Sequence, residues 1–270
     1  LGTNRTAVAL SSGGYHTCAI LDNGDVSCWG YNNGGQLGNG ATTDKNTPTL
    51  TSSLGSGRTA VALSSGYTHT CAILDNGDVS CWGLGGYGRL GNGGTTNKNT
   101  PTLTSSLGTN RTAVALSSGG SHTCAILDNG DVSCWGYGYH GQLGNGASTD
   151  KHTPTLTSSL GSGRTAVALA SGYDHTCVVI DNGSVSCWGY GASGQLGNGA
   201  TTDKLTPTLT NSLGTYQTAL LVDGDLDGDG TLDIFDDFPN NPIRSISCNP
   251  GQYGRYLCVD SPAGKYVPAS

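Results

Sequence analysis

The sequence contains no glutamate, no methionine and only two phenylalanines among its 270 residues, and 11% of its residues are charged. Glutamate and methionine are strong helix formers, whereas the glycine, serine and threonine that are abundant here suit tight turns and strands. No stretch shows a helical period of useful length, and none is long and apolar enough to cross a membrane. These absences argue against a helical fold and predict an all-β protein.

Residue sets typical of enzymes are also missing. The chain has no glutamate, no cysteine that is expected to be free and no serine in a nucleophile-elbow motif. It is therefore not expected to be an enzyme. It has no basic patch, so a nucleic-acid partner is not expected either. Residues 1–212 carry 11 aspartates and 9 basic residues, while residues 213–270 carry 8 and 3. This acidic excess near the C-terminus indicates a bound cation.

An internal repeat dominates what is present. The segment His-Thr-Cys-Ala-Ile-Leu-Asp-Asn-Gly-Asp-Val-Ser-Cys-Trp-Gly at 16–30 returns almost unchanged at 69–83, 122–136 and 175–189, each time 53 residues later. A fixed period of this length is typical of an array whose units bury their apolar faces against their neighbours. Because the chain lacks methionine and starts inside a repeat, we expect it to be a piece of a longer product. The predicted units are 1–53, 54–106, 107–159 and 160–212.

Each copy is predicted to contain a disulfide-linked hairpin. Apolar residues alternate with small polar ones on both sides of Asp-Asn-Gly, which predicts strand, turn and strand. With Gly24 in the left-handed conformation, Cys18 lies opposite Cys28 at a non-hydrogen-bonded position, where side chains come closest. The alternative is free buried thiols, but ten pairable cysteines favour disulfides and an extracellular or cell-surface location. The predicted pairs are Cys18–Cys28, Cys71–Cys81, Cys124–Cys134, Cys177–Cys187 and Cys248–Cys258.

The remaining strands of each unit complete a propeller blade. One strand precedes the hairpin, and another follows it around Pro48, where a proline suits an edge strand that misses no amide donor. The motifs Gly-x-x-His-Thr-Cys-Ala-Ile-Leu, Asn-Gly-x-Val-x-Cys-Trp-Gly and Gly-Gln-Leu-Gly-x-Gly, followed by a proline, resemble the regulator-of-chromosome-condensation repeat. That resemblance implies a propeller of four-stranded antiparallel blades, with seven blades in the family's known folds against four copies here. The paired cysteines resemble its secreted prokaryotic members.

The copies differ mainly before the histidine, after Trp-Gly, and in a polar loop at Asn46, Asn99, His152 and Leu205. We expect these positions on surface turns, where they either form a recognition surface or vary neutrally. The recurring histidines either ring a metal or bond backbone within their blades, and the tryptophans either stack on sugars or fill the blade core; the second choice is preferred in each case. Glycosylation sequons contain Asn4, Asn110 and Asn182.

The C-terminal part departs from the repeat. Residues 213–222 match the first strand of a fifth copy, which either closes blade four or pairs with another subunit. Residues 223–242 resemble a thrombospondin type-3 repeat, and residues 243–270 are expected to form a small disulfide module. Carboxylates at alternate positions with a turn glycine fit a calcium-binding loop. Its predicted Ca²⁺ ligands are Asp225, Asp227, Asp229, Thr231 through its carbonyl, Asp233 directly or through water and Asp236, with Asp223 and Asp237 available to a second ion.

Together these features predict an extracellular structural or surface protein, a disulfide-linked array with bound calcium. Near-identical units with an incomplete blade count suit assembly into a homo-oligomer or a head-to-tail filament, because a heterologous interface that does not close makes a fibre. The alternative function is a secreted binding module that recognises a protein or glycan through its variable loops.

Electron microscopy of the purified protein with and without a chelator tests the filament expectation. Calcium-dependent filaments are expected if repeats and calcium segment assemble head to tail. Monodisperse particles in both conditions would rule the filament out and leave the binding module.

Overall fold

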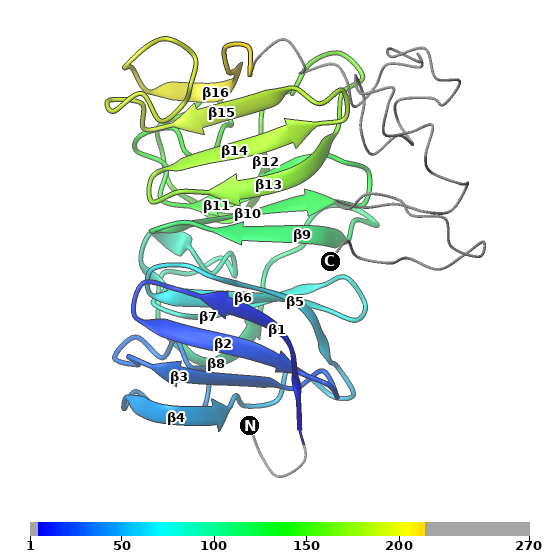
Figure 1. Cartoon of the computed structure of the whole chain (residues 1–270). Coiled ribbons are helices and arrows are strands. Elements are labelled where there is room, and N and C mark those ends of the chain that lie inside the picture. The colour runs from blue at the N-terminus through cyan, green and yellow to red at the C-terminus, as the bar shows by residue number, and fades with distance from the viewer. Residues whose placement is uncertain (1–4, 214–270) are drawn as a thin grey trace, which may run out of the picture. The chain divides into compact units, whose positions relative to one another are not determined.

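The computed structural model describes residues 5–213. Backbone contacts divide the chain into Leu1–Asn211 and Ser212–Ser270, and the first unit contains four four-stranded antiparallel sheets in which strand order follows the sequence (Figure 1). The predicted all-β array of four-stranded blades is therefore confirmed. In the described part of the chain, no helix has the length and apolar character needed to span a membrane. The predicted calcium-binding segment, residues 214–222 of the predicted extra strand, the predicted Cys248–Cys258 pair and Asn4 all lie outside the described residues.

The four blades have the same strand lengths. A single 3₁₀ turn, η1 (Gly86–Gly88), interrupts the loop after the third strand of blade two. The strands are β1 (Ala7–Ser12), β2 (His16–Leu21), β3 (Val26–Gly30) and β4 (Lys45–Leu50) in blade one; β5 (Ala60–Ser65), β6 (His69–Leu74), β7 (Val79–Gly83) and β8 (Lys98–Leu103) in blade two; β9 (Ala113–Ser118), β10 (His122–Leu127), β11 (Val132–Gly136) and β12 (Lys151–Leu156) in blade three; and β13 (Ala166–Ser171), β14 (His175–Ile180), β15 (Val185–Gly189) and β16 (Lys204–Leu209) in blade four.

The hairpin between β2 and β3 has the predicted register. Cys18 lies opposite Cys28 and Ile20 opposite Val26, and the two cysteines form a disulfide with their Cα atoms 4.1 Å apart. The turn closes through a hydrogen bond from Gly24 N to Leu21 O (2.8 Å), and Gly24 has a φ of 80°, which a residue with a side chain adopts at a cost. The other three blades carry the equivalent disulfides Cys71–Cys81, Cys124–Cys134 and Cys177–Cys187.

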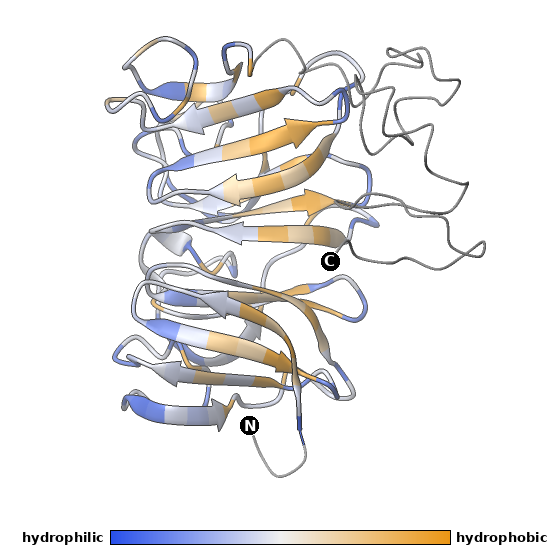
Figure 2. Cartoon of the chain, in the orientation of Figure 1, coloured by the Kyte–Doolittle hydropathy of each residue, from blue (hydrophilic) through white to orange (hydrophobic). Residues whose placement is uncertain are grey.

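The apolar core lies between consecutive blades. Where blades one and two meet, blade one contributes Cys18, Ile20 and Val26, and blade two contributes Leu74 and Trp82, all at most 3% exposed. The same combination recurs between blades two and three and between blades three and four. Figure 2 shows the apolar residues gathered in the later half of strands such as β2 and β14. Each blade therefore depends on its neighbour to bury its face.

Polar bonds fix the spacing between blades. The indole Nε1 of Trp82 donates to Gln36 O of blade one (3.0 Å), and Trp135 and Trp188 donate to the preceding blade in the same way. These three side chains are fully buried, which confirms the blade-core interpretation of the tryptophans over sugar stacking for them. The first strands also bond directly, since Ser65 N donates to Ser11 Oγ (2.8 Å).

The outer strand of each blade contains the recurring proline, and β4, with Pro48, lies at the edge of its sheet as predicted. The expectation that the third variable position lies on a surface turn was wrong, because Asn46 and its equivalents lie within these outer strands. From there Asn99 Nδ2 donates to Gly40 O of the preceding blade (2.8 Å). Variation at this position therefore also touches the contact between blades.

Replacing both cysteines of one internal blade, as in C71A/C81A, is expected to lower the free energy of unfolding by about 3 kcal/mol, because the disulfide closes a short loop in the unfolded chain. Truncating two buried sulfur atoms adds to that loss. Urea unfolding of the variant beside the intact protein measures the change, and an unchanged midpoint would contradict it.

Candidate functional site

Three of the four recurring histidines form side-chain bonds between blades rather than within them. Nε2 of His16 lies 2.7 Å from Thr70 Oγ1, and His69 and His122 contact Thr123 and Thr176 at 2.9 Å. The preferred interpretation, a bond to backbone in the same blade, was wrong because the neighbouring blade presents a buried hydroxyl at this point. Among residues 5–213, no group of three metal-ligating side chains is placed to hold an ion.

The hydrogen-bond pattern sets the tautomer of these imidazoles. Thr70 Oγ1 donates to Gln36 O (3.0 Å), so it accepts from His16 Nε2. The proton therefore sits on Nε2, and the buried Nδ1 of His16 has no hydrogen-bond partner. Burial lowers the pKa of His16 to about 4 and that of His122 to about 3. These histidines are therefore neutral, form structural hydrogen bonds, and are unsuited to general acid–base catalysis near neutral pH.

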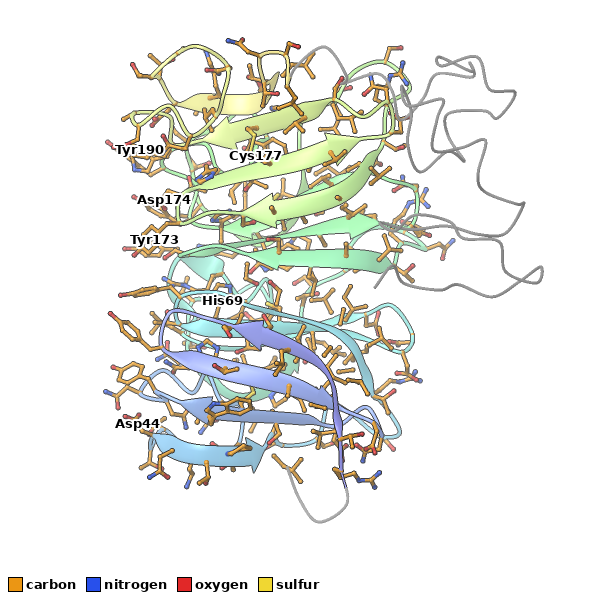
Figure 3. The ribbon with its side chains drawn as sticks, viewed as in Figure 1. Asp44, His69, Tyr173, Asp174, Cys177 and Tyr190 are labelled. Carbon is orange, nitrogen blue, oxygen red and sulfur yellow. A yellow bond between two sulfur atoms is a disulfide. The ribbon has the colours of Figure 1, made fainter. Side chains whose placement is uncertain are left out.

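The loops at one end of the sheets form a tyrosine-rich surface. The variable positions before the histidine and after Trp-Gly come together there, and Figure 3 shows Tyr173, Asp174 and Tyr190 at that end. Every tyrosine in residues 5–213 has an aromatic ring contact. We call this surface the tyrosine-rich face, and it consists of Tyr15, Tyr31, Tyr67, Tyr87, Tyr137, Tyr139, Tyr173, Tyr190 and the ring of His140.

One row of rings crosses blades one, two and four. Tyr15 contacts Tyr31 and Tyr67, and Tyr67 contacts Tyr173, with centroids 5.1 to 6.0 Å apart and edge-to-face orientations. Tyr67 Oη donates to Tyr15 Oη (2.8 Å), which is the main cause of the raised pKa of Tyr67. Beside the row lies a hollow of about 260 Å³, lined by the serine-glycine turns of all four blades together with Tyr67 and Tyr173.

A second group of rings covers blades two to four. Tyr87 lies 4.8 Å from Tyr137, and His140 lies 5.1 Å from Tyr139 and 4.8 Å from Tyr190, measured between ring centroids. Tyr139 is 66% exposed, so most of its surface is open to a partner. We call Tyr87, Tyr137, Tyr139, His140 and Tyr190 the second ring group.

Charged side chains lie among these rings. Arg89 stands where blades one, three and four have glutamine. It donates through Nε to Gly86 O (2.9 Å) and through Nη1 to Thr68 Oγ1 (3.1 Å), and burial lowers its pKa. Asp174 is half-buried, and burial raises the pKa of its carboxyl group. The site thus contains one inward-turned cation and a partly desolvated carboxylate beside exposed rings.

The structure shows where several of the predicted site residues lie. Two of the three groups of variable positions, those before the histidine and after Trp-Gly, meet on the tyrosine-rich face, as a recognition surface requires. The sequence analysis did not predict that these loops join into one surface. The recurring tyrosines in loops that otherwise contain mostly small side chains are a sequence signal for it. The sequon residue Asn110 is exposed and Asn182 is partly buried; their glycosylation stays a prediction.

Comparison with known proteins places the repeats in a family pattern. The pattern described as "Regulator of chromosome condensation (RCC1) repeat" matches residues 23–73, 76–126, 129–179 and 182–219, and a second pattern with the same description matches 7–36, 60–89, 113–142 and 166–195. The first three segments of the first pattern begin within a hairpin and continue into the next blade, so they cover both sides of a blade contact. The segments of the second pattern each lie within one blade.

Individual relatives share this region. The ultraviolet-B receptor UVR8 of Arabidopsis thaliana is 35% identical over 222 residues, which is 82% of this chain and 50% of UVR8. The human E3 ubiquitin-protein ligase HERC2 is 34% identical over 214 residues, 78% of this chain and 4% of HERC2. The chain therefore spans half of the one relative and a small fraction of the other, and neither whole protein's activity transfers to it.

Solved structures agree on the fold. Human WBSCR16 aligns with a TM-score of 0.69 and 22% identity, covering 78% of this chain and 54% of that one. Yeast RCC1 (Prp20), solved with Kap60 bound, aligns with a TM-score of 0.69 and 20% identity, covering 80% and 51%. At these identities the likeness supports the propeller fold alone.

The free energy of unfolding is expected to fall as the pH is lowered through the histidine range. The unfolded chain takes up protons on its imidazoles near pH 6.5, while His16 and His122 in the folded chain stay neutral until about pH 4 and 3. The stability is therefore complete above 6.5 and is lost progressively below it.

Denaturant unfolding between about pH 7 and pH 5 measures this slope. The variant H122Q keeps a donor for Thr176 without a titrating ring, so its slope should be shallower than that of the intact chain. Equal slopes for H122Q and the intact chain would contradict the assignment.

Proposed function

The chain belongs to the regulator of chromosome condensation (RCC1) repeat family, and from this premise we propose that it is a binding module that recognises a protein partner through the tyrosine-rich face. One observation carries the proposal: all tyrosines of residues 5–213 converge on one end of the blades, in the loops where the copies differ. Tyrosine is enriched in the parts of protein interfaces that contribute most of the binding energy.

The exposure of the rings supports this role. Tyr15, Tyr139 and Tyr173 are 59%, 66% and 61% exposed, whereas the repeated tryptophans of blades two to four are buried in the core. A contiguous exposed aromatic surface is unusual on a protein that has no partner for it. The repeats have protein-binding relatives in structure: yeast RCC1 (Prp20) was solved with Kap60 bound.

The relatives favour this binding module over the filament expected from the repeat count, since they include a receptor, a ubiquitin-protein ligase and a propeller that was solved with a bound protein. We also propose an extracellular or cell-surface location, supported by four disulfides that need an oxidising environment. Calcium binding at 223–237 and membership of the secreted prokaryotic branch remain proposals that rest on sequence resemblance.

Selection of a displayed random-peptide library on the full chain tests the proposal. The variant Y15S/Y67G/Y173G replaces three exposed rings with the residues that blade three carries at the same positions, so the turns keep a sequence that already folds in this chain. Selected peptides should bind this variant at least about tenfold more weakly, because an aromatic side chain at the centre of an interface commonly contributes about 2 kcal/mol.

The matched control is L50A/L103A/L156A, which removes three leucines of the outer strands that are 52 to 54% exposed. Binding should survive in this control, and both variants should keep the circular dichroism spectrum of the intact protein. Peptides that bind the tyrosine variant and the intact chain equally well would refute the role of the face.

A further inference from the structure

We propose that Asp174 and the second ring group bind a cationic side chain, arginine or lysine, of the protein partner. The inference rests on the proposed function and names the chemistry that this part of the tyrosine-rich face recognises. A carboxylate combined with exposed aromatic rings provides both a charge-assisted hydrogen bond and a cation–π contact.

The Asp174 carboxylate has an acceptor oxygen to spare. Gln142 Nε2 donates to its Oδ1 (3.2 Å), and within residues 5–213 this is the side chain that bonds it. The carboxyl group is half-buried, and burial raises its pKa, so an ionised Asp174 gains from a cation at its other oxygen. Figure 3 shows Asp174 at the end of the sheets between Tyr173 and Tyr190.

Within residues 5–213, no arginine or lysine is a charged neighbour of Asp174. Asp174 has His140, His175 and Asp203 as its charged or titratable neighbours, and the pKa of Tyr137 is raised by burial and then by Asp174 and Asp150. Arg89 is directed elsewhere, since its Nη1 donates to Thr68 Oγ1 (3.1 Å) and to Gly120 O (3.4 Å). The Asp174 carboxylate is therefore available to a cation that a partner supplies.

The rings leave space for a cation. Tyr139 meets His140 at an interplanar angle of 89°, and His140 meets Tyr190 at 67°, so the pairs are edge-to-face. Tyr139 also stacks on Tyr137, with ring centroids 6.3 Å apart and an interplanar angle of 17°, yet it is 66% exposed. The exposed part of an aromatic ring can attract a cation within about 6 Å. His140 is oriented by its Nδ1, which lies 2.9 Å from Asp203 Oδ2.

The blade scaffold does not require these residues. Blades one to three carry tyrosine, threonine and serine at the position of Asp174, and blade one has Asn33 and Gly34 where blade three has Tyr139 and His140. In blade one, Gln36 Oε1 accepts a hydrogen bond from Gly34 N (2.9 Å), just as Gln142 Oε1 accepts one from His140 N in blade three. The Nε2 of Gln36, however, has no carboxylate partner. Asp174 is therefore an addition to a fold that forms without it.

Nuclear magnetic resonance titration of the full chain with N-acetyl-arginine amide tests the proposal, with N-acetyl-citrulline amide as the uncharged isostere. Arginine amide should shift the resonances of Tyr139 and His140, and the citrulline compound should bind at least about tenfold more weakly, since it lacks the charge. Equal shifts from both compounds, or none from arginine amide, would overturn the proposal.

Two substitutions, each to the residue that another blade carries at the same position, distinguish loss of the Asp174 site from a general effect of net charge. D174S installs the residue of blade three and should weaken arginine binding about tenfold, the loss of one charge-assisted bond. D131S installs the residue that blade four carries in its hairpin turn, removes the same charge from the chain and should leave binding unchanged. Binding that survives D174S, or is lost equally in D131S, would contradict the assignment.

Peptides selected on the intact chain distinguish this inference from the proposed function. They should be enriched in arginine or lysine and should lose affinity for D174S. Peptides that need the tyrosines but show neither property would leave the binding module intact and refute the cation site. A failure to select any peptide that depends on the tyrosines would count against the proposed function instead.

Discussion

The contact between consecutive blades is the interaction on which the structure depends. A single hairpin and its two flanking strands cannot bury an apolar face alone, so Cys18, Ile20 and Val26 of one blade close against Leu74 and Trp82 of the next. The disulfide holds the hairpin that presents this face, and the histidine–threonine and tryptophan–carbonyl bonds set the spacing. Stability therefore accumulates from one contact to the next along the array.

This division of labour explains where the sequence varies. Apart from the variable position of Asn46 in the outer strand, the strands are nearly identical because they must fit their neighbours. The loops at the histidine end need only connect the strands. Exposed tyrosines that arise there are set side by side by the regular blade spacing. The result is a broad aromatic surface, with an aspartate and an inward-turned arginine between the rings, on a scaffold that does not need it.

Sequence reasoning succeeded wherever the chemistry is local. The Cys18–Cys28 pairing, the left-handed Gly24 and the edge position of Pro48 follow from strand alternation, turn geometry and the missing proline amide. It failed for His16, whose partner Thr70 is 54 residues away in the next blade, and for Asn46, which the pattern placed in a turn but which lies in a strand. The first error concerns a contact between blades, and the second concerns where the outer strand begins.

The sequence by itself determined the repeat, the strands of each blade, the disulfide pairing and the family, because each of these depends on neighbouring residues or on a fixed period. Only the tertiary structure decided that the variable loops of all four blades share one face, that Tyr67 contacts Tyr173 two blades away, and that Asp174 lies among rings without an arginine or lysine of residues 5–213 as a charged neighbour. The physical reason is that these relations depend on how one blade packs on the next. A repeated motif indicates which surfaces pack together, but it does not indicate which loop side chains become neighbours.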